Sequence, residues 1–324
     1  MTYASGGLIQ ATDYNGFLST INGVWGTGSS DSGYGQTPLS TVSAGGNVTA
    51  TQWSTLLSTV SSMASTQGTT ITALTPTPVA GNTILYFAQL TNNINAVTGS
   101  TINNAAALGT QYTAWTGTSG KTAGTGSGST PWTIVFTHTI TWDSANAARY
   151  FFNAGGQIKW QCGKSSTGTV ADPEWNDLAS TLVGAIFITG GTRTQTIVGS
   201  SYTGTTKVGG TGTPATLATT TGWYDLTTSD TLIYKQFADT APYTGQYIEI
   251  NAKTAGSGTQ LVLTTNWVDP GNGAAGAPDN ITGGTAPSGV TLGTAPATVV
   301  SYFPPSTTYL TNSWGTPTVA AATA

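Results

Sequence analysis

The side chains that could do acid–base chemistry are few, and three of them lie at one expected helix start. These are Asp172, Glu174 and Asp177, and two more acids, Asp225 and Asp230, follow later in the chain. A glycoside hydrolase needs two carboxyl groups that face each other across the substrate, roughly 5–9.5 Å apart. Acids gathered at a helix start are explained more simply as a cap and as charges that favour the helix macrodipole. We therefore expect no catalytic residue and no enzyme activity.

Metal ligands and nucleophiles are equally sparse. His138 is the only histidine and shares strand parity with aromatic residues, so a hydrogen-bonded core histidine is favoured over a catalytic base or a zinc ligand. Cys162, the single cysteine, lies on an apolar face and is interpreted as a small buried hydrophobe. The run Asp-Pro-Gly-Asn-Gly from Asp269 lacks the ligand spacing of an EF-hand loop, so a turn is favoured over a calcium site. The sequence predicts neither a metal nor a cofactor.

Charge is scarce along the whole chain. Asp, Glu, Lys and Arg make up 6% of the 324 residues, where about 25% is usual in soluble proteins. The eight basic residues form no cluster, which argues against a nucleic-acid partner. No apolar run is long enough for a membrane helix, and the first residues lack the features of a signal peptide. A hydroxyl- and amide-rich surface packs against other copies at little cost in charge desolvation, so the composition favours a structural role.

The elements that carry these residues are expected to start from one long strand. Side chains alternate between an apolar and a threonine-rich face from Trp132 to Trp142. Asp143 or Ser144 is the expected N-cap of a short helix that ends near Phe152. Alternation resumes from Gln157 to Cys162. We expect this strand, helix and returning strand to provide the strand pair around which the main domain is built.

The first hundred residues contain an internal repeat. Gly7 to Ile21 aligns with Gly46 to Val60 at an offset of 39 residues, and a weaker third copy starts at Gly81. Thr12 and Thr51 are the expected N-caps, each followed by apolar residues at helical spacing. Helices this short cannot bury their apolar faces alone, so they must pack on each other or on partner chains. The residues expected to serve this assembly are Tyr14, Phe17, Leu18, Trp53, Leu56 and Leu57.

Later elements complete the expected fold. Asp172-Pro173 predicts a helix start, with Trp175, Leu178 and Leu182 on the buried stripe. The sequence therefore predicts a mainly β protein with small α elements, in which an N-terminal helical repeat region is followed by an antiparallel β-sandwich domain. The further strands are expected at residues 185–189, 222–226, 231–237, 246–252, 260–268 and 298–303.

Composition also indicates the domain bounds. Residues 1–116 are the repeat region for assembly or attachment, and 117–130 are a Gly/Ser/Thr linker. Residues 131–310 are the β-sandwich domain, within which 269–298 are expected to be irregular, and 311–324 are a flexible tail. A Gly/Ser loop from Gly26 to Pro38 is long enough to extend against a neighbour.

Arg149 stands out because it lies among aromatic residues in a chain with only eight basic side chains. One interpretation is a salt bridge or a clamp on backbone carbonyls inside its domain, and the other is a contact between subunits. We favour the first. Arg149, Tyr150 and Phe151 are therefore assigned a structural or assembly role.

Several stretches resemble virion structural proteins of tailed bacteriophages. The most specific is Ala147 to Ile158, Ala-Ala-Arg-Tyr-Phe-Phe-Asn-Ala-Gly-Gly-Gln-Ile. A tryptophan-containing helix at Glu174 to Leu178 and the run Gly-Trp-Tyr-Asp-Leu at Gly222 to Leu226 are similar to the same family. The N-terminal units look like repeats that precede that domain. The resemblance spans most of residues 1–267 and does not extend to residues 269–324.

This resemblance implies a component of the neck, collar, whisker or tail fibre, assembled in the host cytoplasm and located in the virion. It implies a homo-oligomer, a trimer being one option, that also contacts other virion proteins. A second hypothesis is a receptor- or glycan-binding fibre module, in which residues 269–298 contact a host surface glycan. A third, a cell-wall hydrolase or depolymerase, is disfavoured because His, Cys and paired acids are scarce.

Overall fold

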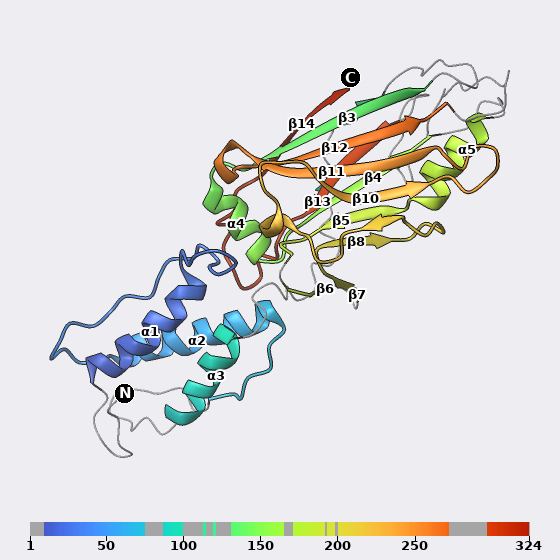
Figure 1. Ribbon diagram of the computed structural model, residues 1–324. Coiled ribbons are helices and arrows are strands. Elements are labelled where there is room, and N and C mark those ends of the chain that lie inside the picture. Colours follow the sequence, from blue (N-terminus) through green and yellow to red (C-terminus); the bar gives the residue numbers. More distant parts are fainter. Residues whose placement is uncertain are drawn as a thin grey trace.

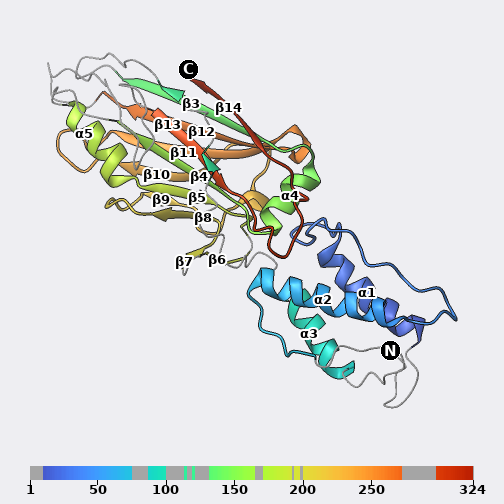
Figure 2. The same cartoon turned by 180° about the vertical axis from the view of Figure 1, so that it is seen from behind.

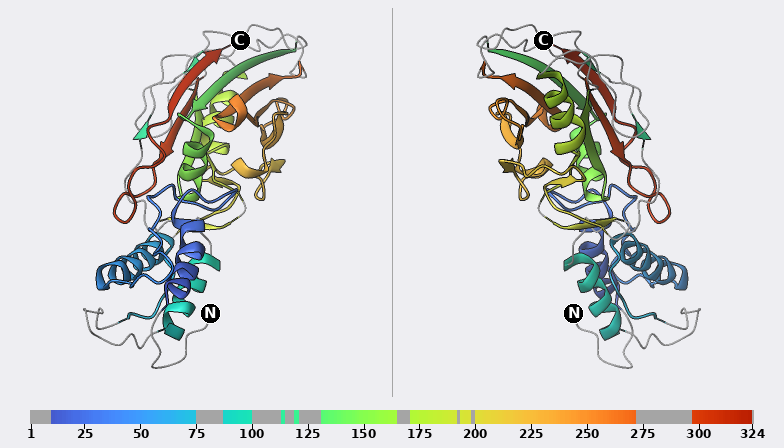
Figure 3. Two further views of the ribbon diagram at one scale, coloured as in Figure 1. Left: turned by 90° about the vertical axis from the view of Figure 1, so that its left-hand side faces the viewer. Right: turned by 90° about the vertical axis from the view of Figure 1, so that its right-hand side faces the viewer.

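The chain folds into a helical region, residues 10–99, at one end of a longer two-sheet region, residues 131–323 (Figures 1 and 3). The computed structural model is therefore β-rich with a smaller helical part. The expected linker and the expected irregular segment at 269–298 lie largely outside the described residues. The described residues are 10–74, 87–99, 113–114, 119–120, 131–164, 171–191, 193–197, 200–271 and 297–323.

The described part of the helical region contains α1 (Ala11–Trp25), α2 (Ala50–Gln67) and α3 (Phe87–Gly99). Trp53 of α2 has its ring centroid 6.1 Å from that of Tyr14 and 6.3 Å from that of Phe17, both on α1. The apolar stripes thus pack on one another, as short helices require. The other side chains buried in this contact include Leu18, Ile21, Leu56, Val60, Leu90, Ile94 and Val97.

The helices begin earlier than the sequence indicated. Thr12 and Thr51 both lie inside their helices, so the prediction that they are N-caps is wrong. The cap of α2 is Thr49, whose Oγ1 accepts the backbone N–H of Gln52 at 3.2 Å. Gln52 Oε1 accepts the backbone N–H of Thr49 at 2.9 Å in return. This reciprocal capping box has a Thr-x-x-Gln spacing, which locates a cap better than a threonine that merely precedes an apolar run.

Two antiparallel sheets form the two-sheet region, and Figure 2 shows them from behind. One has the order β1-β13-β4-β5-β8, with β2 also paired to β13, and the other has the order β14-β3-β12-β11-β10-β9. A separate hairpin joins β6 (Gln195–Ile197) to β7 (Ser200–Tyr202). The first sheet contains β1 (Thr113–Ala114), β2 (Ser119–Gly120), β4 (Gln157–Gly163), β5 (Ala185–Ile188), β8 (Thr205–Val208) and β13 (Ala297–Phe303). The second contains β3 (Trp132–Thr141), β9 (Thr216–Leu217), β10 (Thr231–Phe237), β11 (Tyr247–Ala255), β12 (Gln260–Asp269) and β14 (Thr318–Thr323).

The long strand expected at 132–142 is β3, and its apolar face is buried at alternate positions. It does not pair with the returning strand β4, so the expected strand pair is wrong. β3 pairs with β12 and β14, whereas β4 lies between β13 and β5 in the other sheet. α4 (Ala145–Asn153), whose N-cap is Ser144, carries the chain from one sheet to the other. The alternation of apolar and polar residues indicates which face of a strand a side chain takes, but it does not indicate which strand lies beside it.

Tryptophan side chains form a cluster where a helix packs on the second sheet. Trp267 of β12 stacks on Trp175 of α5 (Ala171–Asp177) with ring centroids 5.7 Å apart, and Trp132 lies 5.1 Å from Trp175. The helix continues into a π-helical turn, η1 (Leu178–Leu182), which keeps Leu178 and Leu182 buried. The buried stripe predicted for this helix is confirmed.

Two segments differ from expectation. Residues 222–226, expected to be a strand, contain the 3-10 turn η2 (Trp223–Asp225), and Asp225 closes it by accepting the backbone N–H of Gly222 at 2.9 Å. In place of the expected tail at 311–324, the structure has β14 paired to β3, preceded by a buried Trp314. Alanine carries little hydrophobic signal, so periodicity does not identify a strand such as Val-Ala-Ala-Ala.

The capping box of α2 gives a test of where the helix begins. We expect Thr49→Ala to lower the free energy of unfolding by about 1 kcal/mol, because the N–H of Gln52 loses its acceptor. Thr51→Ala is the matched control, and it should change stability by a few tenths of a kcal/mol at most, since Thr51 is exposed inside the helix. Urea denaturation followed by tryptophan fluorescence measures both. A larger loss at Thr51 would contradict the assignment.

Candidate functional site

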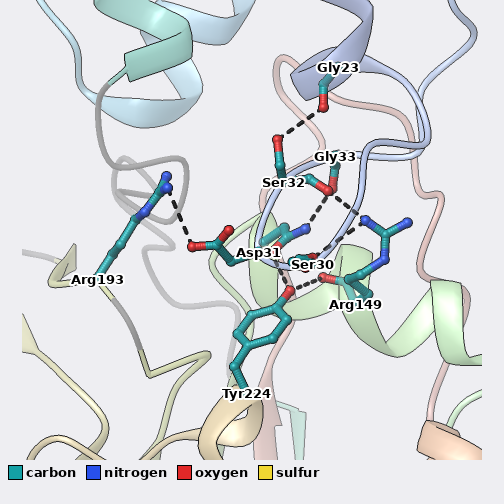
Figure 4. Close-up of polar contacts among 9 residues, drawn as sticks. Gly23, Ser30, Asp31, Ser32, Gly33, Arg149, Arg193 and Tyr224 are labelled. Carbon is teal, nitrogen blue, oxygen red and sulfur yellow. Dashed lines mark hydrogen bonds and ion pairs between the residues drawn. The ribbon is translucent and has the colours of Figure 1, made fainter.

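A group of polar contacts between distant parts of the chain lies where the helical region meets the two-sheet region. We call it the joint, and it consists of the loop at residues 27–36 together with Arg149, Asn153 and Tyr224. The loop leaves the end of α1 and reaches α4 (Figure 1). Figure 4 shows the side chains that meet there.

The loop is shaped by its bonds to α1 and by glycine. The backbone N–H of Tyr34 donates to the carbonyl of Val24 at 2.8 Å, so the loop doubles back along the helix end. Gly33 has φ +108°, and a Cβ there would lie 2.2 Å from the carbonyl oxygen of Thr27. Only glycine adopts this tight turn without strain. The turn directs several loop carbonyls toward α4.

Arg149 of α4 binds those carbonyls. Its Nη1 donates to Ser32 O at 2.5 Å, and its Nη2 donates to Thr27 O at 2.6 Å. Nη2 also donates to the side chain of Asn146 at 3.1 Å, which holds the guanidinium in place from its own helix. A planar guanidinium can satisfy several acceptors at once, whereas a lysine ammonium presents a single point charge. Arg149 is therefore a carbonyl clamp, but it joins two regions of the chain rather than acting inside one.

Asn153 and Tyr224 continue the joint one turn along α4. Asn153, fully buried, donates from Nδ2 to Gly33 O at 2.9 Å, and its Oδ1 accepts the hydroxyl of Tyr224. Burial raises the pKa of the Tyr224 hydroxyl above its ordinary value, and the nearby positive charge of Arg149 opposes this only in part. The tyrosine therefore stays a neutral donor through ordinary alkaline pH. Its turn is held against α4 by Trp223, which stacks on Phe152 at 5.2 Å.

An ion pair supports the other side of the loop. Arg193 Nη2 lies 3.3 Å from Asp31 Oδ2, with both side chains more than a quarter exposed. Figure 4 shows Arg193 and Arg149 approaching the loop from two sides. Because solvent screens this pair, its contribution to stability is small compared with the clamp.

The segment after β13 reaches the same loop. Gln36 is buried, and its Oε1 accepts the backbone N–H of Thr311 at 2.8 Å while its Nε2 donates to Thr311 O at 2.9 Å. Ser313 Oγ donates to Tyr34 O at 2.5 Å. The loop is thus bonded to α1, to α4 and to residues far along the chain, which makes it the point where both regions are tied together.

The structure divides the residues that the sequence singled out for assembly. Tyr14, Phe17, Leu18, Trp53 and Leu56 are buried within the helical region of one chain. Leu57 is the exception, being only half-buried. These six therefore form a core with one residue at its edge, and they are separate from the joint.

The aromatic neighbours of Arg149 do lie near it. Tyr150 packs on Gly35, where an added Cβ would come within 2.4 Å of the tyrosine ring. Phe151 is fully buried and contacts Trp142 at 5.4 Å, inside the two-sheet region. The loop at 26–38 thus meets the chain's own α4, where the sequence had suggested a neighbour.

The candidate acids are dispersed in structural positions. Glu174 is buried, and its Oε1 accepts the backbone N–H groups of Asp239 and Thr240, each at 3.3 Å. Carboxylate oxygens of Glu174, Asp177 and Asp239 lie within 4.8 Å of one another. Glu174 and Asp177 are therefore close together in space, and Asp239 joins them from another loop. The side chain of Asp172 lies outside the described part of the structure. Asp225 caps η2, and Asp230 lies 3.2 Å from Lys253.

The other candidate ligands are in the core or in a turn. His138 is fully buried on β3. Cys162 is fully buried, donates to the carbonyl of Ala179 at 3.4 Å, and has its pKa raised by burial. Asp269 accepts the N–H of Gly271 at 2.8 Å and a side-chain N–H of Gln246 at 2.8 Å, which is the geometry of a closed turn.

Comparison of the chain with protein-family models, with curated proteins and with solved structures found no match. Within the described residues, every helix is too short or too polar to cross a membrane.

Sequence reasoning missed most of the joint. Arg149 stood out by its rarity, but Asn153, Tyr224 and Gln36 did not, because uncharged polar residues are abundant in this chain. One available signal was the spacing of Gly28, Gly33 and Gly35 directly after a helix. Closely spaced glycines there are typical of a loop that approaches another backbone.

Removing the clamp should loosen the joint specifically. We expect Arg149→Met to lower the free energy of unfolding by about 2 kcal/mol, because charge-assisted bonds to two carbonyls are lost. Arg149→Lys should recover less than half of this loss, since an ammonium cannot match the guanidinium's fork. Hydrogen exchange of the amides at residues 27–36 should rise in both variants. Lys253→Met, which breaks an exposed ion pair, is the control and should leave that exchange unchanged.

Because Tyr224 is buried, we predict that the free energy of unfolding depends on pH in the alkaline range. An unfolded tyrosine ionises near pH 10, while the buried one stays protonated, so the free energy of unfolding should fall as pH rises above 10. Tyr224→Phe removes this proton linkage and should reduce the slope by at most about 1.4 kcal/mol per pH unit. Denaturation series between pH 9 and 11.5 measure the slope. Tyr309→Phe changes an exposed tyrosine and should leave the slope as it is. Equal slopes for Tyr224→Phe and the unmodified chain would contradict the assignment.

Proposed function

We propose that this chain is a structural component of the virion of a tailed bacteriophage, forming part of the neck, collar or tail-fibre apparatus. The observation that carries the proposal is the meeting of two stretches that resemble that class. Ala147 to Ile158 and Gly222 to Leu226 are far apart in the sequence, yet Phe152 stacks on Trp223 and Asn153 bonds Tyr224. Arg149 and Asn153 of the first stretch then bond the loop of the N-terminal region. Contact in the folded chain between two stretches that resemble the same class supports the proposal better than similarity of sequence alone.

The finer architecture belongs to the same proposal. We take the two antiparallel sheets as a β-sandwich with tryptophan between the layers, and the three helices as copies of one repeated unit. The offset of 39 residues favours the repeat, because it relates Gln10 to Thr49, and each directly precedes its helix. Two regions tied together by hydrogen bonds, in a chain with few charged residues, suit a part that is built into a particle.

Assembly into a homo-oligomer, with a trimer as one option, then needs a surface other than the buried stripe. Leu57, Ile71 and Leu74 are half-buried and line a depression of about 290 Å³ on the helical region. Unlike Leu56, these side chains keep carbon surface that a second copy can cover. We propose this depression as the contact, together with other virion proteins as further partners.

Particle analysis tests the function directly. Virions purified on a density gradient from the source of this gene should contain the chain at a fixed copy number, as measured by quantitative mass spectrometry. Antibodies against the purified chain should label one position on the particle in electron micrographs. Particles that lack the chain while the infected cell contains it would overturn the proposal.

The assembly surface predicts a separable phenotype. We expect Leu57→Glu to shift the purified chain toward monomer in light scattering, by placing a charge in an apolar contact, while thermal unfolding changes little. Leu56→Glu should instead unfold the helical region, because Leu56 is fully buried. Ser19→Glu adds the same charge at an exposed position on α1 outside the depression and is the control. An unchanged oligomer in Leu57→Glu would place the contact elsewhere.

A further inference from the structure

A cavity of about 510 Å³ lies on the helical region, between α1, α2 and the segment that follows the loop of the joint. Its size falls in the range of roughly 300–1,000 Å³ typical of small-ligand sites. It is distinct from the depression at Leu57, with which it shares no lining residue. Gln36, the last residue of the loop in the joint, lines one edge of the cavity, and the proposed assembly contact does not use it.

The aromatic side chains of the cavity have their polar atoms already bonded. Tyr14 donates its hydroxyl to Gln52 O at 3.2 Å, and Trp25 donates its indole N–H to Thr37 O at 3.1 Å. Tyr14 is buried, with 2% of its surface exposed, so the carbon surface that a ligand can reach is that of the partly exposed Trp25. Aromatic carbon surface packs well against the C–H face of a sugar ring, which is apolar.

The wall on α2 is made of hydroxyls. Thr51 and Thr55 lie one turn apart on one side of the helix, and both are exposed. Thr55 Oγ1 donates to Thr51 O at 2.9 Å and keeps lone pairs that can accept. Ser40 and Thr37, also exposed, bring further hydroxyls from the opposite segment.

Charge is missing from this lining. Among the described residues that form the cavity, none is Asp, Glu, Lys, Arg or His. An anionic ligand such as a phosphate or a uronic acid would find no counter-charge there, and a cation would find no carboxylate. An uncharged ligand with one apolar face and many hydroxyls matches the cavity best.

We propose that this cavity binds a neutral saccharide. Trp25 provides the surface on which a sugar ring packs, and the hydroxyls of Thr51, Thr55 and Ser40 bond the sugar hydroxyls. This goes beyond the structural role proposed above and does not depend on it, because the cavity would bind the same ligand in any setting.

An extended peptide fits this wall less well. A peptide that adds to a strand needs a row of free backbone N–H and C=O groups. Here Pro38 has no N–H, and Leu39 has both its N–H and its C=O bonded to the side chain of Asn22, at 2.9 and 3.0 Å. Side-chain hydroxyls, rather than backbone groups, are what the cavity has available.

Binding of the intact chain to an array of oligosaccharides tests the proposal. The probes are chitotetraose, maltohexaose and mannotriose as neutral sugars, with sialyllactose and a hyaluronan tetrasaccharide as acidic ones, followed by calorimetry on each hit. We expect at least one neutral probe to bind and the acidic probes to bind at least tenfold more weakly. Absence of binding to every neutral probe, or tighter binding of the acidic probes, would overturn the proposal.

Variants locate the site. Thr55→Arg places a long charged side chain over the cavity from an exposed helical position, so the fold should survive and affinity for the neutral hit should fall at least tenfold. Ser19→Arg adds the same charge at an exposed position on α1 outside the cavity and should bind like the unmodified chain. Unchanged affinity in Thr55→Arg would show that the sugar binds elsewhere. Displacement of the sugar from the unmodified chain by an uncharged threonine-rich peptide would reassign the cavity to peptide.

Discussion

The Arg149 guanidinium binds carbonyls of a loop more than a hundred residues earlier in the chain, and the joint depends on it. A loop with this tight a turn leaves its carbonyls unpaired by any strand or helix, and a buried carbonyl without a donor is costly. A planar guanidinium carries several N–H donors, so one arginine side chain can pair with several of these carbonyls. The relative position of helices and sheets follows from where that cation lies on α4.

Elsewhere the chain uses amides where other proteins use ions. Asn15 accepts the N–H and donates to the carbonyl of Val42, so that one side chain pairs with a backbone as a neighbouring strand would. An amide does this without the desolvation cost of a buried charge, which explains how a chain with 6% charged residues holds its long connections. The same two-bond arrangement joins Asn22 to Leu39, Asn93 to Thr72 and Gln36 to Thr311.

The helical region serves two demands that compete for apolar surface. The apolar faces of α1, α2 and α3 are buried against one another, because short helices need such packing in order to be stable. Contact with other molecules is then left to the margins, where Leu57 is half-buried and where the partly exposed Trp25 lines a cavity. The proposed assembly contact and the proposed sugar site lie in two separate hollows, so one does not block the other.

The sequence by itself determined that helices form in the N-terminal region and after β3, which face of β3 is buried, and that Arg149 is unusual. These properties are local, because side-chain periodicity follows directly from backbone geometry. Only the tertiary structure decided that β3 and β4 lie in different sheets, that residues 318–323 pair with β3, and that Asn153 meets Tyr224. Strand partners and joints depend on residues far apart in the chain, and alternation in one segment carries no information about which distant segment will satisfy its backbone.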